Sequence, residues 1–467
     1  MSTIASLSPV TLNDEQNTAA NLLQQFVETD NNDIFILKGH AGTGKTMLIN
    51  ILIKYLNKKE IPFHLLASTG RAAKVVGEKA NTKAETVHRH IYILENEVSD
   101  ENKKTKKLFF KLKRNIEEKT TIYIVDECSM ISDIFIKGGF THFGSGRLLS
   151  DLLYYTRDHK CIFVGDPSQL PPINAKFSPA LNKTYISEKY KKTVVCSDLT
   201  VSMRYRQNTG IWYNTDAIRK NIENKMFDPL KIQLTGFKES FLYFKPEQMI
   251  GSYVKILKNK GIDNCIFITY TNALAAEING MIRTLLFPDS QIMMQGELLM
   301  VMQNNYKYNI TNSEHIEITE IGDKENKAGL TFRDITGKIK EYNGYRILKA
   351  KIIEEVLYGK APNLSSEQEY YLFRDFAIRT AKKGIRSGDQ QFIMEMVADP
   401  YLNAIRAKFG YAVTCHKAQG GEWNDVFIIF EKMLFAPNIR ENLYRWTYTA
   451  ISRSSERLHF LDNYCIK

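Results

Sequence analysis

Short apolar runs recur along the chain, and stretches with helical spacing lie between them. The runs span residues 34–37, 62–66, 122–125, 161–164, 265–268 and 426–430, and each has the length of a buried strand. Residues 12–26 and 47–56 instead place their apolar side chains at helical spacing. Since strands that are covered on both faces are apolar throughout, this alternation predicts an α/β fold with parallel sheets.

Two regions depart from this alternation. Residues 99–121 are dense in lysine around the apolar triplet Leu108-Phe109-Phe110. Residues 304–408 begin with alternating segments separated by turns, and they become helical after residue 366. We interpret both regions as insertions into larger α/β domains.

Length and composition are those of a folded protein with a sizeable core. At roughly 150 residues per domain, 467 residues predict three domains, or two with insertions. The chain is 43% hydrophobic and 25% charged, which excludes a mostly disordered chain. It has no apolar run near the ~18 residues of a membrane span, and its first residues lack a basic and a long apolar region, so we expect no signal peptide. Its six scattered cysteines fit reduced thiols, so we expect a soluble protein of the cytoplasm.

The chain carries an excess of positive charge. Its 63 Lys and Arg residues against 52 Asp and Glu residues give a net charge of +11. Such an excess favours polyanionic partners such as nucleic acid, although a general solubility charge is an equal alternative.

A phosphate-binding motif follows the first apolar run. The segment has the Walker A pattern G-x-x-x-x-G-K-[ST], and its residues are Gly39, His40, Ala41, Gly42, Thr43, Gly44, Lys45 and Thr46. The glycines let backbone N–H groups surround phosphate oxygens at the start of the next helix. We expect Lys45 to reach the β- and γ-phosphates and Thr46 to offer its hydroxyl to Mg²⁺. The motif predicts a nucleoside triphosphate site, against the alternative of an ordinary glycine turn.

Two carboxylates end the apolar run at residues 122–125. Asp126 would lie at the carboxyl edge of the sheet, beside Mg²⁺, and Glu127 could polarise an attacking water. Alone, such a pair is more often surface charge. Together with the Walker A motif, it indicates hydrolysis of the triphosphate.

Three further residues could contact the γ-phosphate. Gln169 follows the run at 161–164 within a stiff, proline-rich loop, so its amide could contact the γ-phosphate, or the loop could be a simple turn. Arg206 and Arg453 lie far along the chain, from where a guanidinium could reach the triphosphate from another domain. For each arginine the alternative is a solvated surface group.

Three short segments are candidates for binding a nucleic-acid backbone. Each carries small, hydroxylated or basic residues just after a predicted strand, and the candidates are Thr69, Arg71, Thr86, His88, Thr414, His416 and Lys417. Such groups can bind phosphates without reading sequence. Individually the signals are weak, because a lone histidine is more often a surface or core residue.

In this order, the motifs resemble those of superfamily 1 helicases, specifically the 5′→3′ (1B) branch with its RecD-like and phage Dda-like enzymes. Gln16 matches the Q motif, which recognises adenine. Motifs I, Ia, Ib, II and III fall at residues 39–46, 68–73, 86–88, 126–130 and 165–172. Motif IV falls at Arg206, motif V at residues 412–422, which include Glu422 at the nucleotide, and motif VI at 448–457.

The resemblance implies a domain organisation. Two RecA-like P-loop motor domains would comprise residues 1–91 with 121–196 (domain 1A) and residues 197–303 with 408–467 (domain 2A). Residues 92–120 would form an inserted 1B region with the strand-separating pin, whose aromatic residue is Phe109 or Phe110 unless both are core. Residues 304–407 would form accessory domain 2B, an SH3-like barrel with a helical tower. Residues 131–150 look longer than the usual link and have no assigned role.

The resemblance also implies an activity. We expect an ATP-dependent 5′→3′ DNA helicase that uses ATP and Mg²⁺, acts on single-stranded DNA and tailed or forked duplex DNA, and works as a monomer. A single-strand-binding or replisome protein is a candidate partner. The alternatives are an RNA helicase of the same superfamily and a nucleic-acid-stimulated P-loop ATPase without unwinding.

Overall fold

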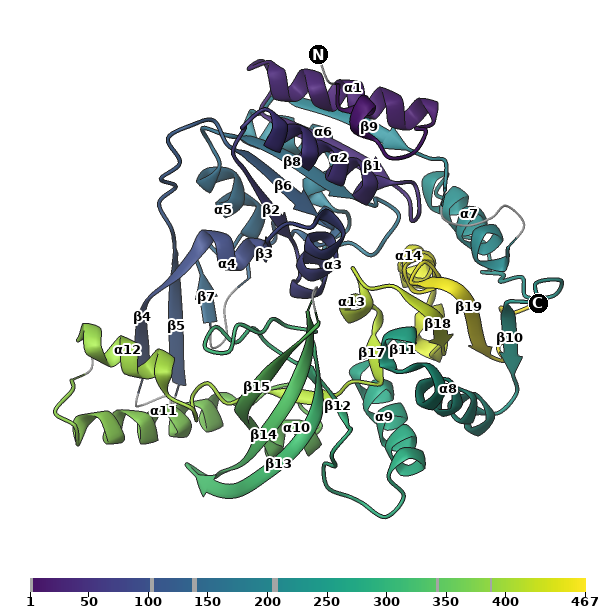
Figure 1. The fold of residues 1–467 in the computed structure, drawn as a ribbon. Coiled ribbons are helices and arrows are strands. Elements are labelled where there is room, and N and C mark those ends of the chain that lie inside the picture. The colour runs from purple at the N-terminus through teal and green to yellow at the C-terminus, as the bar shows by residue number, and fades with distance from the viewer. Residues whose placement is uncertain (1–2, 101–104, 137–140, 204–208, 342–343, 387–388) are drawn as a thin grey trace.

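The computed structural model describes residues 3–100, 105–136, 141–203, 209–341, 344–386 and 389–467. Arg206, the candidate in motif IV, therefore lies outside the described residues. Two motor domains and an accessory region make up the described chain (Figure 1). Among these residues, no helix combines the length and the apolar character that crossing a membrane requires.

The first motor domain is built on a six-stranded parallel sheet in the order β3-β2-β6-β8-β1-β9. Its strands are β1 (Ile34–Gly39), β2 (Phe63–Ala67), β3 (Ala84–Thr86), β6 (Ile122–Asp126), β8 (Lys160–Gly165) and β9 (Val194–Leu199). Its helices are α1 (Asp14–Glu28), α2 (Lys45–Lys58), α3 (Gly70–Ala80), α4 (Val87–Ile91), α5 (Leu148–Tyr155) and α6 (Lys183–Tyr190). Short 3₁₀ turns lie at Ala5–Leu7, Cys128–Met130 and Pro179–Leu181.

Strand β1 shows why the central runs are apolar throughout. Phe35 and Leu37 belong to the core on one face of the sheet, whereas Ile34 and Ile36 belong to the core on the other face. Parallel pairing also aligns the strand ends, since Lys38 of β1 pairs with Gly165 of β8. The loops that follow β1, β2, β6 and β8 therefore emerge from one edge of the sheet.

The second motor domain has a five-stranded parallel sheet in the order β10-β19-β18-β11-β17. Its strands are β10 (Ser240–Tyr243), β11 (Cys265–Thr269), β17 (Ala412–Thr414), β18 (Trp423–Ile428) and β19 (Ser454–Leu461). Its helices are α7 (Gly210–Glu223), α8 (Pro246–Lys260), α9 (Asn272–Leu286), α13 (Cys415–Ala418) and α14 (Arg440–Ile451), with 3₁₀ turns at Ile262–Asn264, Lys432–Phe435 and Pro437–Ile439. The predicted α/β fold with two parallel-stranded motor domains is thus confirmed.

The accessory region has an antiparallel sheet in the order β15-β14-β13-β12-β16, and its helices lie between β15 and β16 along the chain. Its elements are β12 (Leu298–Val301), β13 (His315–Lys327), β14 (Leu330–Glu341), β15 (Gly344–Ile353), α10 (Glu354–Tyr358), α11 (Ser366–Ala381), α12 (Gln390–Ala398) and β16 (Ala407–Phe409). A bridge between Ile352 and Ile405 brings the β15 edge back towards β16. The sheet therefore includes β12, which the predicted boundaries assign to the second motor domain, because β12 pairs with β13 across a long loop.

A small sheet inserted in the first motor domain has the order β4-β5-β7. It combines β4 (Tyr92–Asp100) and β5 (Thr105–Leu112) with β7 (Thr141–Phe143), which comes from the 131–150 segment that had no assigned role. Helices α11 and α12 lie beside this sheet in Figure 1. Leu94 of β4 packs against a cluster that includes Phe376 and Phe392 of these helices. The inserted sheet is thus supported by the accessory region.

Candidate active site

A cavity of about 290 Å³ lies between the two motor domains. The first motor domain contributes residues 41–47, Ala72, Val75, Lys79, Asp126, Glu127, Gln169 and, just after β9, Met203; the second contributes Gly420, Gly421, Glu422 and Arg453. The structure therefore brings the candidate residues of motifs I, II, III, V and VI together around one space.

The phosphate-binding loop turns between β1 and α2 with two glycines in the left-handed region. Gly42 and Gly44 have φ angles of 80° and 94°, conformations that side chains with a Cβ rarely adopt. The Lys45 ammonium donates hydrogen bonds to the carbonyl oxygens of Gly39 at 2.6 Å and His40 at 2.9 Å. These carbonyls hold the lysine within the loop, so it must leave them to reach a phosphate.

Asp126 ends β6, Glu127 follows it, and both line the cavity. Burial and the neighbouring Glu127 charge raise the pKa of Asp126 to about 7. Glu127 has a φ of 51°, and its buried Oε2 has no hydrogen-bond partner among the described residues. Strained backbone of this kind persists where the surroundings enforce it, often at functional sites. A divalent cation and a water would satisfy these carboxylates, so the donor set fits Mg²⁺ beside Thr46 and Asp126.

The loop after β8 connects the cavity to the second motor domain. Gln169 is buried, and its Oε1 has no hydrogen-bond partner among the described residues. The backbone N–H of the next residue, Leu170, donates a hydrogen bond to Thr449 Oγ1 at 3.0 Å. Its carbonyl oxygen accepts from Gln419 Nε2 at 3.2 Å. The position of Gln169 is therefore tied to α14 and to motif V.

Arg453 reaches the cavity from the second motor domain and is almost fully buried. Its Nε donates to the Thr449 carbonyl at 3.0 Å, its Nη1 to the Gly421 carbonyl at 3.3 Å, and its Nη2 to Ser452 Oγ at 3.0 Å. The guanidinium thus faces the nucleotide cavity while its own domain holds it.

Gln16 lies behind the phosphate-binding loop and does not line the cavity. Its Oε1 accepts from the Asn13 N–H at 3.1 Å, which completes a capping box at the start of α1. Its Nε2 donates to the Thr43 carbonyl at 3.0 Å. Both ends of the amide are occupied in this arrangement, so contact with a base requires an exchange of partners.

A second cavity, of about 300 Å³, gathers four of the nucleic-acid candidates. Thr69, Thr86, His88 and Phe110 line it, together with Ser68, Gly70, Thr141, Phe143, Gln303, Asn304, Tyr306, Asn312 and Ser313. Thr69 and Thr86 also cap α3 and α4 by accepting from the backbone N–H groups of Ala72 and Arg89. Burial lowers the pKa of His88 to about 4, which keeps its ring neutral near pH 7.

Sequence reasoning missed the aromatic neighbours of this second cavity. Phe110 stacks on Phe143, with ring centroids 4.7 Å apart, and lies 5.8 Å from the Tyr306 ring. Phe109 instead lies beside His142, at 5.6 Å. No local signal pointed to Phe143 or Tyr306, because each reaches the cavity through strand or loop contacts that are distant along the chain.

The remaining nucleic-acid candidates lie elsewhere. The Arg71 guanidinium stacks 4.0 Å over the Trp423 ring of β18, in the interface of the two motor domains. Thr414 and Lys417 line a third cavity, of about 210 Å³, with Lys360 and Lys408. Burial lowers the pKa of His416, and burial with the nearby Lys408 charge lowers that of Lys417 to about 8. The structure therefore places Thr69, Thr86 and His88 at the second cavity, Arg71 at the domain interface, and Thr414 and Lys417 at the third cavity.

Comparisons with known proteins agree with this arrangement. Residues 11–228 match the family model of an AAA domain, and residues 409–461 match that of a UvrD-like helicase C-terminal domain. The chain is 23% identical over 514 residues to an uncharacterized protein of Acanthamoeba polyphaga mimivirus, covering 96% of this chain and 99% of that protein. It is 24% identical over 442 residues to the ATP-dependent DNA helicase dda of Enterobacteria phage T4, covering 89% and 92%. The crystal structure of a Bacteroides Pif1 helicase in complex with ADP-AlF3 and ssDNA shares the fold, with a TM-score of 0.50, 16% identity, and coverage of 97% and 92%.

Proposed function

We propose that this chain moves 5′→3′ along single-stranded DNA while separating duplex DNA. The premise is that the chain belongs to the superfamily 1B helicases and is an ATP-dependent DNA helicase. The observation that carries this proposal is the cavity between the motor domains, where Lys45 and Glu127 face Arg453. A triphosphate bound there would contact both domains, so its hydrolysis would change the contact between them.

Each group of the nucleotide cavity has a distinct role in this proposal. Backbone N–H groups of the phosphate-binding loop and the Lys45 ammonium hold the phosphates. The Thr46 hydroxyl and the Asp126 carboxylate would hold Mg²⁺, which when bound supplies positive charge to the phosphate oxygens. Glu127 accepts a proton from the attacking water, a role supported by its buried Oε2, which no described residue contacts by a hydrogen bond. Arg453 adds positive charge to the γ-phosphate from the second motor domain.

Gln169 and motif V link hydrolysis to movement. Because Leu170 is hydrogen bonded to Thr449 and Gln419, displacement of Gln169 by a γ-phosphate would shift the second motor domain. Glu422 lines the same cavity and is part of motif V. Arg206 keeps its role as a second arginine at the γ-phosphate, as a proposal from the sequence.

Single-stranded DNA would cross the second cavity. Thr69 and Thr86 line this cavity, and Phe110 and Tyr306 offer rings for base stacking. Lys417 would contact phosphates from the second motor domain, next to Lys408. Such contacts recognise backbone and stacking faces, so we expect binding without sequence preference. The 5′→3′ direction is inferred from the family.

Strand displacement with ATP and Mg²⁺ tests this function. Duplex DNA with a 5′ or a 3′ single-stranded tail is incubated with the wild type, with Lys45→Ala, and with Lys58→Ala as a matched control at the exposed far end of the same helix. We expect unwinding of the 5′-tailed duplex only, lost in Lys45→Ala and retained in Lys58→Ala.

Three other outcomes would each correct the proposal. Displacement from the 3′ tail alone would overturn the direction and keep the motor. ATP hydrolysis without displacement would favour an ATPase that does not unwind. Stronger stimulation of hydrolysis by single-stranded RNA than by single-stranded DNA would favour the RNA helicase alternative.

A further inference from the structure

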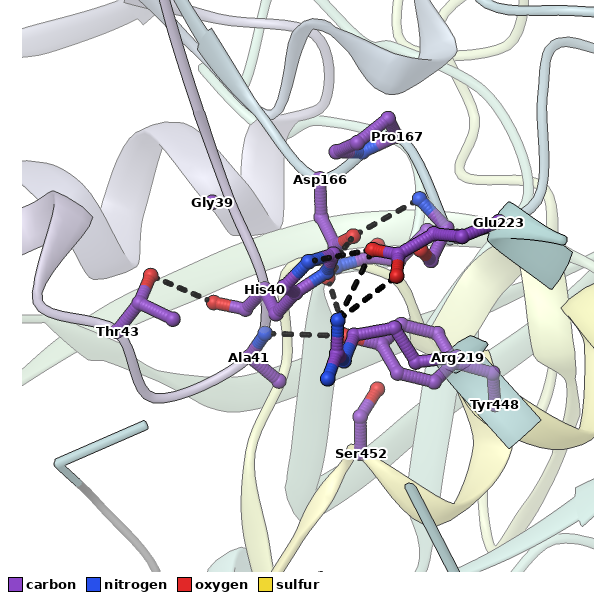
Figure 2. Close-up of polar contacts among 12 residues, drawn as sticks. Gly39, His40, Ala41, Thr43, Asp166, Pro167, Arg219, Glu223, Tyr448 and Ser452 are labelled. Carbon is purple, nitrogen blue, oxygen red and sulfur yellow. Dashed lines mark hydrogen bonds and ion pairs between the residues drawn. The ribbon is translucent and has the colours of Figure 1, made fainter. Parts of the chain in front are cut away.

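His40 belongs to the phosphate-binding loop, yet its side chain faces the second motor domain (Figure 2). The residue is buried, with 8% of its surface exposed. Its main chain contacts other residues of the loop, and its side chain contacts carboxylates. Neither set of contacts has a role in the proposed catalysis.

The His40 ring lies between carboxylates of the two motor domains. Its Nε2 is 3.1 Å from Glu223 Oε1 at the end of α7, and its Nδ1 is 3.6 Å from Asp166 Oδ1 after β8. Arg219, one turn earlier in α7, holds Glu223 through its Nη1 at 3.0 and 2.9 Å. Figure 2 shows Glu223 and Asp166 beside the ring, and Arg219 beside Glu223. The imidazole therefore bridges a carboxylate of the first motor domain to one of the second.

Asp166 is the fixed side of this bridge. Burial alone would raise its pKa, but the contacts with His40 and Lys45 outweigh burial and lower the pKa to about 2. Tyr448 of α14 donates its hydroxyl to Asp166 Oδ2 at 2.8 Å and accepts from the Ala41 N–H at 3.1 Å. Two helices of the second motor domain, α7 and α14, thus contact the loop at this point.

The main chain of the same residue holds the catalytic lysine. The His40 carbonyl accepts from Lys45 Nζ and from Thr43 Oγ1, both at 2.9 Å. When Lys45 leaves this carbonyl for a phosphate, the loop around His40 loses one of its internal ties. One residue therefore connects the lysine, through its backbone, to the position of α7, through its ring.

We propose that His40 is a positioning residue: its contact with Glu223 stabilises the arrangement of the loop in which the His40 carbonyl holds Lys45, and this contact is released when nucleotide draws Lys45 away. This inference rests on the proposed nucleotide site and adds a specific link between that site and α7. A contact made in one state only shifts the equilibrium towards that state. Its loss must therefore favour the nucleotide-bound arrangement.

The test is ADP affinity measured by calorimetry on the full chain, in the wild type and in Glu223→Ala. Glu223 lies outside the catalytic groups, and its side chain is 43% exposed. Because half-exposed pairs are weak, we expect ADP to bind about two- to fivefold more tightly to Glu223→Ala. Asp216→Asn is the matched control, since Asp216 also binds Arg219, at 2.6 Å, on the same helix. A substitution that only damaged the fold would weaken binding, so tightening identifies the link.

A double-mutant cycle completes the test. In the background of His40→Ala, Glu223→Ala should have no further effect, because the contact is already absent. Unchanged or weaker ADP binding in Glu223→Ala, with normal binding by the wild type, would overturn the link and leave the proposed function intact. Absence of ADP binding by the wild type would overturn both.

Discussion

Arg453→Ala removes the guanidinium that faces the nucleotide cavity from the second motor domain. In the structure this side chain donates hydrogen bonds to the carbonyl oxygens of Thr449 and Gly421 and to Ser452 Oγ. To contact a γ-phosphate, it must give up some of these bonds. The substitution therefore tests whether the free energy that Arg453 gains at the transition state exceeds that of the hydrogen bonds it gives up.

The magnitudes favour the transition state. A hydrogen bond made by a charged group is worth about 1.5–3 kcal/mol, so redirecting one of the three bonds of Arg453 costs about that much. Loss of an arginine finger lowers turnover about 10³- to 10⁵-fold in related NTPases, which corresponds to about 4–7 kcal/mol. We therefore expect the kcat of Arg453→Ala to fall at least about 10³-fold, with ADP affinity retained. The free energy of unfolding should drop by about 1–3 kcal/mol, because the buried bonds are lost.

The assay is ATP hydrolysis with saturating single-stranded DNA, alongside calorimetric ADP binding and thermal unfolding. Arg453→Lys should recover part of the rate, because an ammonium restores the charge but not the planar fork of donors. Arg440→Ala is the matched control, an exposed arginine at the start of α14. A folded Arg453→Ala protein with a kcat within tenfold of the wild type would refute the assignment.

Three further predictions concern stability. Burial lowers the pKa of His88 to about 4, so the unfolded chain binds a proton on this ring at a higher pH than the folded chain does. The free energy of unfolding should therefore drop by about 3 kcal/mol at most as the pH falls from about 6.5 to 4. Urea titrations should show this drop in the wild type and a smaller one in His88→Asn. A Cβ at Gly70 would lie 1.5 Å from Thr311 Oγ1, so Gly70→Ala should lower the free energy of unfolding by about 1–3 kcal/mol. Adding Thr311→Gly to this variant should restore the stability. Equal melting temperatures of the wild type and Gly70→Ala would contradict this packing. Gln16→Ala loses the capping box and the bond to the Thr43 carbonyl, and should lower the free energy of unfolding by about 1–2 kcal/mol in the same titrations.

The sequence by itself determined the features that depend on neighbouring residues. Apolar runs such as residues 34–37 specify buried parallel strands, because both faces of each strand are covered. The phosphate-binding loop is equally local, since its glycine spacing sets the backbone of Gly42 and Gly44. The order of such motifs predicted a superfamily 1B helicase, and that prediction is confirmed. The domain boundaries, the roles of the site residues and the direction of movement stay predictions.

Only the tertiary structure decided which distant segments meet. β7 joins the inserted sheet through Phe143, although its segment showed no pattern of its own. Arg71 stacks on Trp423 instead of lining the cavity with Thr69, because the second motor domain places an indole above it. His40 gains its contact with Glu223 in the same way. Local spacing encodes secondary structure and loop chemistry, whereas contacts between segments hundreds of residues apart depend on how whole domains pack.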